Sequence, residues 1–121
     1  MANEIRSSYG LTIASGKGQA SVVGTYTASL TGQQCAFRQS IPTSWTALDI
    51  PAAIASISRI AAANDDATNY VEFSYSADGS TKLAKLVALD GFNLPLQASV
   101  TAIYARANTA ACWVSIIVCE P

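Results

Sequence analysis

The stretch NDDATNYVEFSY, residues 64–75, decides the fold that this sequence predicts. Four of its first six residues are Asn or Asp, whose short side chains hydrogen-bond to nearby backbone and tolerate left-handed conformations. The next six alternate as in a half-buried β-strand, with residues 70, 72 and 74 on one face and 71, 73 and 75 on the other. We therefore expect a turn that leads into a core strand. The turn residues are Asn64, Asp66, Thr68 and Asn69, and the core residues of the strand are Val71 and Phe73.

Strand and turn signals recur at intervals near ten residues along the rest of the chain. Short segments rich in β-formers are bounded by Gly, Pro, Asn or Asp, and no long helical pattern is present. Segments with strand character are 4–14, 19–30 with a bulge at Gly24, 33–41, 44–48, 57–63, 82–87, 92–96, 101–106 and 111–119. The pattern predicts an all-β, antiparallel β-sandwich, jelly-roll-like, with about eight strands. We expect one domain, 1–121, in which residues 1–16 form an N-terminal arm or edge strand.

Two further side chains are expected to anchor the core. Trp45 is the largest side chain in the short extended segment 44–48. Ile116 lies in the middle of the last strand, where residues 114–118 are apolar enough to predict a central strand buried on both faces.

Residues 49–63 fit two patterns. Asp49 and Pro51 are typical of a helix start, and apolar residues follow at helical spacing. The flanking segments are all β, which favours a strand. We expect a turn or one short helical turn near 51–54, and then a strand from about 57 to 63.

The charge content argues for a surface that is buried against other chains. Seven basic and eight acidic residues give a net charge of −1, and charged residues make up 12% of the chain, about half the roughly 25% of an ordinary soluble domain. Near-neutrality argues against nucleic-acid binding, which needs a clustered basic surface. Apolar residues make up 50%, but no run approaches the ~20 that span a bilayer. We expect no secretory signal and no membrane partner.

The cysteines predict free thiols and a reducing compartment. Cys35, Cys112 and Cys119 are odd in number and lack C-x-x-C spacing, which argues against a zinc site or a complete disulfide framework. Cys112 and Cys119 are seven residues apart and should lie on opposite faces of one strand.

Catalytic and ligand-binding interpretations are weaker than structural ones. The chain has no His, which removes the usual general base and metal ligand. Calcium binding by Asp65, Asp66 and Asn69 lacks the 12-residue loop with its terminal Glu, and nothing fixes the separation that an Asp49–Glu72 glycosidase pair would need. We expect no enzyme activity, cofactor or metal. A carbohydrate groove stays open as an alternative to core and interface packing for the aromatics Trp45, Tyr70, Tyr75, Tyr104 and Trp113.

Three motifs carry a resemblance to a known group of proteins. They are TSWTALD at 43–49, N-x-DATNYVE at 64–72 and YA-x-ANTAA at 104–111. In this order and spacing they resemble small structural proteins of tailed-bacteriophage virions, over about residues 43–120. The group often has a Pro-Gly step where this chain has Ser56-Ile57, and a Lys-Pro-Gly-Glu turn where it has residues 89–91, so loop shapes differ.

The resemblance implies a non-enzymatic virion protein made in the host cytoplasm. Its implied place is the capsid exterior, as a decoration or cement protein that bridges subunits of the major capsid protein. A tail or head–tail component, including a receptor- or carbohydrate-binding one, is the alternative. By analogy with jelly-roll modules of virions we expect a homo-oligomer, a trimer, held by contacts poor in charge.

Overall fold

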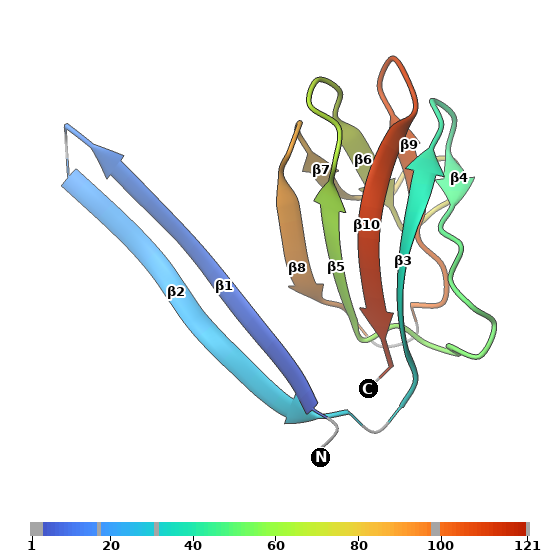
Figure 1. Ribbon diagram of the computed structural model, residues 1–121, viewed down its shortest axis with the longest axis horizontal. Coiled ribbons are helices and arrows are strands. Elements are labelled where there is room, and N and C mark those ends of the chain that lie inside the picture. The colour runs from blue at the N-terminus through green and yellow to red at the C-terminus, as the bar shows by residue number, and fades with distance from the viewer. Residues whose placement is uncertain (1–3, 17, 31, 98–99, 121) are drawn as a thin grey trace. The chain divides into compact units, whose positions relative to one another are not determined.

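The computed structural model describes residues 4–16, 18–30, 32–97 and 100–120, and the chain divides into two compact units. The first unit is Met1–Thr31 and the second is Gly32–Pro121. The sequence predicted one domain with an arm of 16 residues. The first compact unit is longer than this arm, because the strand that follows the arm pairs with it and completes a hairpin (Figure 1).

The first unit is a long antiparallel hairpin of β1 (Glu4–Ser15) and β2 (Gly18–Ser29). Its register is continuous from Glu4 opposite Ser29 to Ser15 opposite Gly18. The bulge expected at Gly24 is therefore wrong. Gly24 pairs in register with Tyr9, and a Cβ at position 24 would collide with the Tyr9 ring. The glycine leaves room for that ring to lie across the partner strand. The two glycines of segment 15–18 predict a turn there, and its residue Lys17 lies outside the described residues.

The second unit consists of two four-stranded antiparallel sheets (Figure 1). The first sheet has the order β3-β10-β5-β8, and the second has the order β4-β9-β6-β7. The strands of the first sheet are β3 (Gln34–Ile41), β10 (Cys112–Cys119), β5 (Arg59–Asn64) and β8 (Gly91–Pro95). Those of the second are β4 (Thr46–Ala47), β9 (Tyr104–Ala107), β6 (Val71–Ser74) and β7 (Lys82–Leu86). The all-β prediction is confirmed for the described residues, with ten strands in place of about eight.

The core of this unit lies between its two sheets. Both sheets contribute alternate residues, since successive side chains of a strand point to opposite faces. Val71 and Phe73 of β6 and Ile116 of β10 are among its fully buried members. The ring of Phe73 meets that of Phe92 from the opposite sheet at 5.2 Å between centroids. Packing of this kind is what stabilises a two-layer β fold.

The expectation that the last strand is buried on both faces is wrong. β10 is central in its sheet, between β3 and β5. Val114 and Ile116 face the core, whereas Trp113 and Ile117 are 50% and 53% exposed. The second sheet covers one face of β10 and leaves the other to solvent.

Trp45 was expected to anchor the core, and this is also wrong. Its side chain is half-buried and is not a member of the core cluster. The ring packs on Gly79, where the backbone φ of +76° and the lack of a Cβ allow close approach, and the Arg106 guanidinium lies 4.8 Å from its centroid. Arg106 lies between the buried residues Ala105 and Ala107 of β9 and therefore points away from the core, so the Trp45 ring that it covers lies on the outer surface of the second sheet.

A register shift changes the end of the central strand. The pairing of β6 with β7 shifts between Phe73 and Ser74. In a regular strand Ser74 would share the outer face with Glu72. Because of the shift it is fully buried. Its hydroxyl donates to the Thr81 carbonyl at 2.9 Å and accepts from the Ser76 N–H at 3.0 Å. These bonds satisfy a polar group that the shift moves inward.

Residues 51–54 form a turn, closed by the Ile54 N–H on the Pro51 carbonyl at 3.0 Å. The described parts of the chain contain no helix, and so none that could cross a membrane. β5 begins at Arg59, two residues later than expected.

Candidate interaction surface

The hairpin has one apolar face and one polar face. Because each residue of β1 pairs with one of β2, the odd-numbered positions of β1 share a face with the even-numbered positions of β2. The paired residues of this apolar face are Ile5 and Ala28, Ser7 and Tyr26, Tyr9 and Gly24, Leu11 and Val22, and Ile13 and Ala20. We call this set the apolar hairpin face. It has no charged member.

Most large side chains of the apolar hairpin face are exposed. Leu11 is 66% exposed and its partner Val22 is 70% exposed, and Tyr9 and Ile13 are each more than half exposed. An exposed row of this kind on a soluble protein marks an interaction site, since scattered single residues are the usual case.

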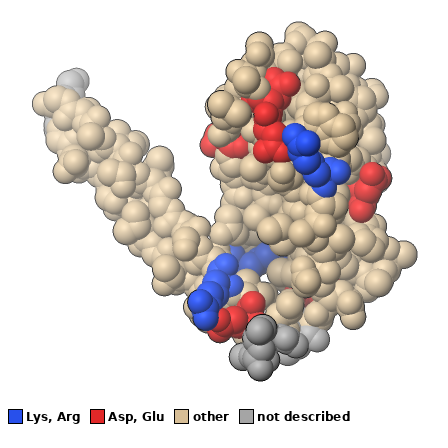
Figure 2. Space-filling model, viewed as in Figure 1, with Lys and Arg blue, Asp and Glu red and all other residues tan. Residues whose placement is uncertain are grey.

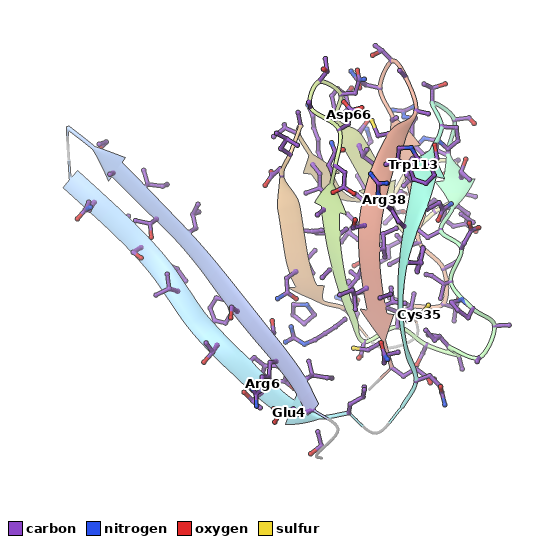
Figure 3. All side chains as sticks on the ribbon, in the orientation of Figure 1. Glu4, Arg6, Cys35, Arg38, Asp66 and Trp113 are labelled. Carbon is purple, nitrogen blue, oxygen red and sulfur yellow. The ribbon has the colours of Figure 1, made fainter. Side chains whose placement is uncertain are left out.

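The opposite face of the hairpin is polar. Its members include Glu4, Arg6, Thr12 and Ser21, with Val23 as the one large apolar side chain. Glu4 and Arg6 form an ion pair with each other, and Figure 3 shows both at the end of the hairpin where β1 begins. The Thr12 and Ser21 hydroxyls are hydrogen-bonded across the strands at 3.0 Å. Figure 2 shows that the visible side of the hairpin is uncharged along most of its length.

The turn that follows β5 is held in place by side-chain hydrogen bonds. Asn64 is buried, and its amide group donates to the carbonyls of Asn69 at 2.8 Å and of Leu86 and Val87 at 3.2 Å each. Its side-chain oxygen accepts from the Asp66 N–H at 3.0 Å. One buried side chain therefore connects the turn to the end of β7.

Asp66 closes the same turn. Its carboxylate accepts from the N–H groups of Asn69 at 2.6 Å and Thr68 at 2.8 Å. These two bonds, Asn69 first, hold the pKa of Asp66 below its usual value. Asn69 in turn accepts from the Thr109 hydroxyl at 2.6 Å. All the acidic and amide groups of the turn thus have backbone or side-chain partners that account for their presence. The described residues contain no group of three acidic, His or Cys side chains placed to hold a metal ion.

The three motifs of the resemblance meet in one sheet. β4, from the first motif, pairs with β9, from the third, and β9 pairs with β6, from the second. The Tyr70 N–H also donates to the Asn108 side chain at 3.1 Å, and the Asn108 N–H donates back to the Tyr70 carbonyl at 3.2 Å. Segments about 30 to 60 residues apart in sequence are adjacent here, so the motifs help to set the geometry of the fold.

The outer face of the second sheet carries a charge network. Glu72 accepts from Lys82 at 2.7 Å and from Arg106 at 3.0 Å, and these two bonds, Lys82 first, lower the pKa of Glu72. A general acid needs a raised pKa, so Glu72 does not suit the acid role in the glycosidase pair considered for it with Asp49. Lys85 lies 4.1 Å from the centroid of the Tyr70 ring. This face is polar and its charges are paired.

The outer face of the first sheet is different. A shallow depression with a volume of about 540 Å³ is lined by small and apolar residues, including Ala36, Ala61, Ala63 and Ile117. Arg38, which also lines the depression, lies 4.9 Å from the centroid of the Trp113 ring and pairs with Asp65 at 3.1 Å. Figure 3 shows Arg38 and Trp113 close to each other. The Ser115 hydroxyl donates to Asp65 at 2.7 Å; this bond and then Arg38 lower the pKa of Asp65.

The aromatic residues considered for a carbohydrate groove are not all together. A second depression, of about 780 Å³, brings Tyr75 and Tyr104 together with Thr81 and Gln97. Trp45, Tyr70 and Trp113 are not among its lining residues.

All three cysteines are free thiols. Cys112 and Cys119 are both buried, and Cys35 is half-buried. Burial, and then the nearby charge of Asp66, raise the pKa of Cys112. A raised pKa makes this thiol a poor nucleophile at neutral pH.

Sequence reasoning missed the apolar hairpin face, although its signal is present. Apolar residues recur at every second position in 5–13 except at Ser7, and again in 20–28 except at Gly24. The assumed bulge at Gly24 hid the fact that the two alternations fall on one face. Comparison of the chain with protein-family models, curated proteins and solved structures found no match.

Proposed function

We propose that this protein is a non-enzymatic structural component of a tailed-phage virion, a decoration or cement protein on the capsid exterior. It works as a homo-oligomer, a trimer, and it bridges subunits of the major capsid protein. It binds neither nucleic acid nor membrane and uses no cofactor.

The observation that carries this proposal is the apolar hairpin face. A two-stranded hairpin is at best marginally stable alone in water, and this one exposes a row of apolar side chains on an uncharged face. Such a segment is suited to a permanent contact with another protein chain. A protein that acts by burying its surface against other chains needs an apolar face of this kind and few charged residues. The low charged fraction of 12% agrees with this.

The resemblance supports the virion assignment. Its three motifs pack together as neighbouring strands β4, β9 and β6, and their polar residues hydrogen-bond to each other. Proteins that share these three motifs would share the sheet that the motifs form. The hairpin lies outside the motifs, so it can differ between such proteins.

We further propose that the second unit is a jelly roll. Its antiparallel pairs are nested: β3 with β10, β4 with β9, β5 with β8, and β6 with β7. A single long hairpin of eight strands, wrapped so that the pairs alternate between two sheets, gives this pattern.

Binding to particles tests the function. The purified protein is mixed with phage particles that lack it and sedimented, and particle-bound protein is measured at low and high salt. We expect saturable binding with little salt dependence, because few ion pairs are available to be screened. Density for the protein on the outside of the head would fix its place. Absence of binding to heads and tails alike would refute the proposal.

A tail protein that binds carbohydrate is the second candidate. The depression lined by Tyr75, Tyr104, Thr81 and Gln97 favours it, since an aromatic ring with nearby polar groups is the usual way to hold a sugar. Titration with host surface polysaccharide, followed by Tyr104→Ala, separates the two candidates. Binding that Tyr104→Ala abolishes would favour the tail protein, and no binding would favour decoration.

A further inference from the structure

We infer that the apolar hairpin face is the contact through which copies of this chain assemble, with the hairpins of three copies packed apolar face to apolar face. This inference rests on the proposed function and names the surface that makes its trimer. The occupant of the face is thus the same face of a neighbouring copy.

The chemistry of the face suits self-association. Leu11 and Val22 form a cross-strand pair at its centre, with Tyr9 and Ile13 on either side along β1, and all four are exposed. The charged residues described in the hairpin, Glu4 and Arg6, lie on the opposite face and pair with each other. Copies can therefore approach without like-charge repulsion and without burying an ion.

The length of the face matches another hairpin. Both strands of the hairpin have 12 residues, whereas the longest strands of the sandwich, β3 and β10, have 8. At about 3.4 Å per residue the hairpin extends roughly 40 Å, about half again as long as a sheet of 8-residue strands. Of the surfaces that this chain offers, an equal hairpin covers the face along its whole length.

A trimer buries more area in total than a dimer. A ribbon two strands wide and about 40 Å long presents roughly 400 Å² on one face. Two such faces bury roughly 800 Å², which is less than the ~1,000 Å² of a specific interface, and three faces bury roughly 1,200 Å² in total, shared among three pairwise contacts. The pleated faces of two-layer β structures pack about 10 Å apart, which leaves room for Leu, Val and Tyr side chains between them.

Two adjacent valines provide a matched test. Val22 and Val23 are 70% and 68% exposed and are neighbours in β2, but they point to opposite faces of the hairpin. Val22→Asp introduces a carboxylate into the apolar hairpin face, and Val23→Asp introduces the same group on the polar face. Sedimentation equilibrium of the wild-type protein and both variants gives their oligomeric states.

We expect a trimer for the wild-type protein and for Val23→Asp. Val22→Asp should associate at least about 100-fold more weakly, because three carboxylates would meet in an apolar contact. Wild-type association should change little between low and high salt. A monomeric or dimeric wild-type protein overturns the inference, as does a Val22→Asp variant that stays trimeric.

Folding and particle binding of each variant are measured in separate experiments. The chain has two tryptophans, Trp45 and Trp113, and both lie in the second unit. Their fluorescence reports whether the sandwich of each variant is folded. Particle binding by a wild-type monomer would refute the hairpin contact and the trimer but leave the decoration role standing. A hairpin-dependent trimer that binds no particle would refute the decoration role and leave the hairpin contact standing.

Discussion

The hairpin and the sandwich are built from the same kind of strand and differ in what covers their apolar side chains. In the sandwich, Val114 and Ile116 of β10 face a second sheet and are fully buried. In the hairpin, Leu11 and Val22 follow the same alternation and are exposed. Alternation therefore specifies that a strand has an apolar face, and the supply of a second layer decides whether that face becomes core or interface. In this chain the sandwich supplies its own layer.

The largest expected effect contrasts a core residue with a hairpin residue. Phe73→Ala should destabilise the sandwich by about 3–5 kcal/mol, the range for deleting a buried aromatic ring. Leu11→Ala removes a comparable apolar side chain from the hairpin and should change the same free energy of unfolding by less than about 0.5 kcal/mol. Urea unfolding followed by tryptophan fluorescence measures both. Equal losses would mean that the two units do not unfold independently.

The next effect concerns the turn that organises the sandwich. Asn64→Ala removes the side-chain donor that the carbonyls of Asn69, Leu86 and Val87 share. It should cost about 2–3 kcal/mol, because buried groups that lose a hydrogen-bond partner are expensive. Asn108→Ala is the control. It removes one exposed hydrogen bond, to the Tyr70 N–H, and should cost about 1 kcal/mol or less. A smaller loss for Asn64→Ala than for Asn108→Ala would contradict the role given to Asn64.

A smaller effect is expected from pH. Glu72 has a pKa that Lys82 and Arg106 lower in the folded state, so the unfolded chain binds its proton more readily. The stabilisation is complete above the unfolded pKa, about pH 4, and is lost as pH falls through the folded value. The free energy of unfolding should therefore decline below about pH 4, and Glu72→Gln should make the decline shallower. Glu4→Gln, in the hairpin, should leave the sandwich profile as it is. An unchanged profile for Glu72→Gln would refute a contribution from this ion pair.

The smallest effect distinguishes the thiols. In the denatured protein, without reductant, an alkylating reagent should label Cys35, Cys112 and Cys119. In the folded protein Cys35, which is half-buried, should react first and Cys112 last, since Cys112 is buried and its pKa is raised. Mass spectrometry of timed samples gives the order. Labelling of a single cysteine in the denatured protein would indicate a disulfide.

Local chemistry explains how much of this fold could be predicted. The alternation of 71 and 73 and the Asn and Asp residues of 64–69 fixed a strand and a turn, because their interactions are close in sequence. Trp45 could not be assigned correctly, since its position depends on Gly79 and Arg106, which are 34 and 61 residues away. The exposed side of β10 was missed for a similar reason. An apolar strand looks the same whether one or two layers cover it, and only tertiary packing distinguishes the two.

The nested strand pairing has a consequence for how the protein is made. β10, which lies between β3 and β5, ends at Cys119, and Cys119 pairs with Gln34. The first sheet therefore cannot close until residue 119 has left the ribosome. The hairpin needs only its own 12-residue strands, and hairpins form within about 1–10 µs, far faster than synthesis at roughly 5–20 residues per second. Each nascent chain thus displays its apolar hairpin face for seconds before its sandwich can fold, and neighbouring chains on one messenger can meet through it during translation.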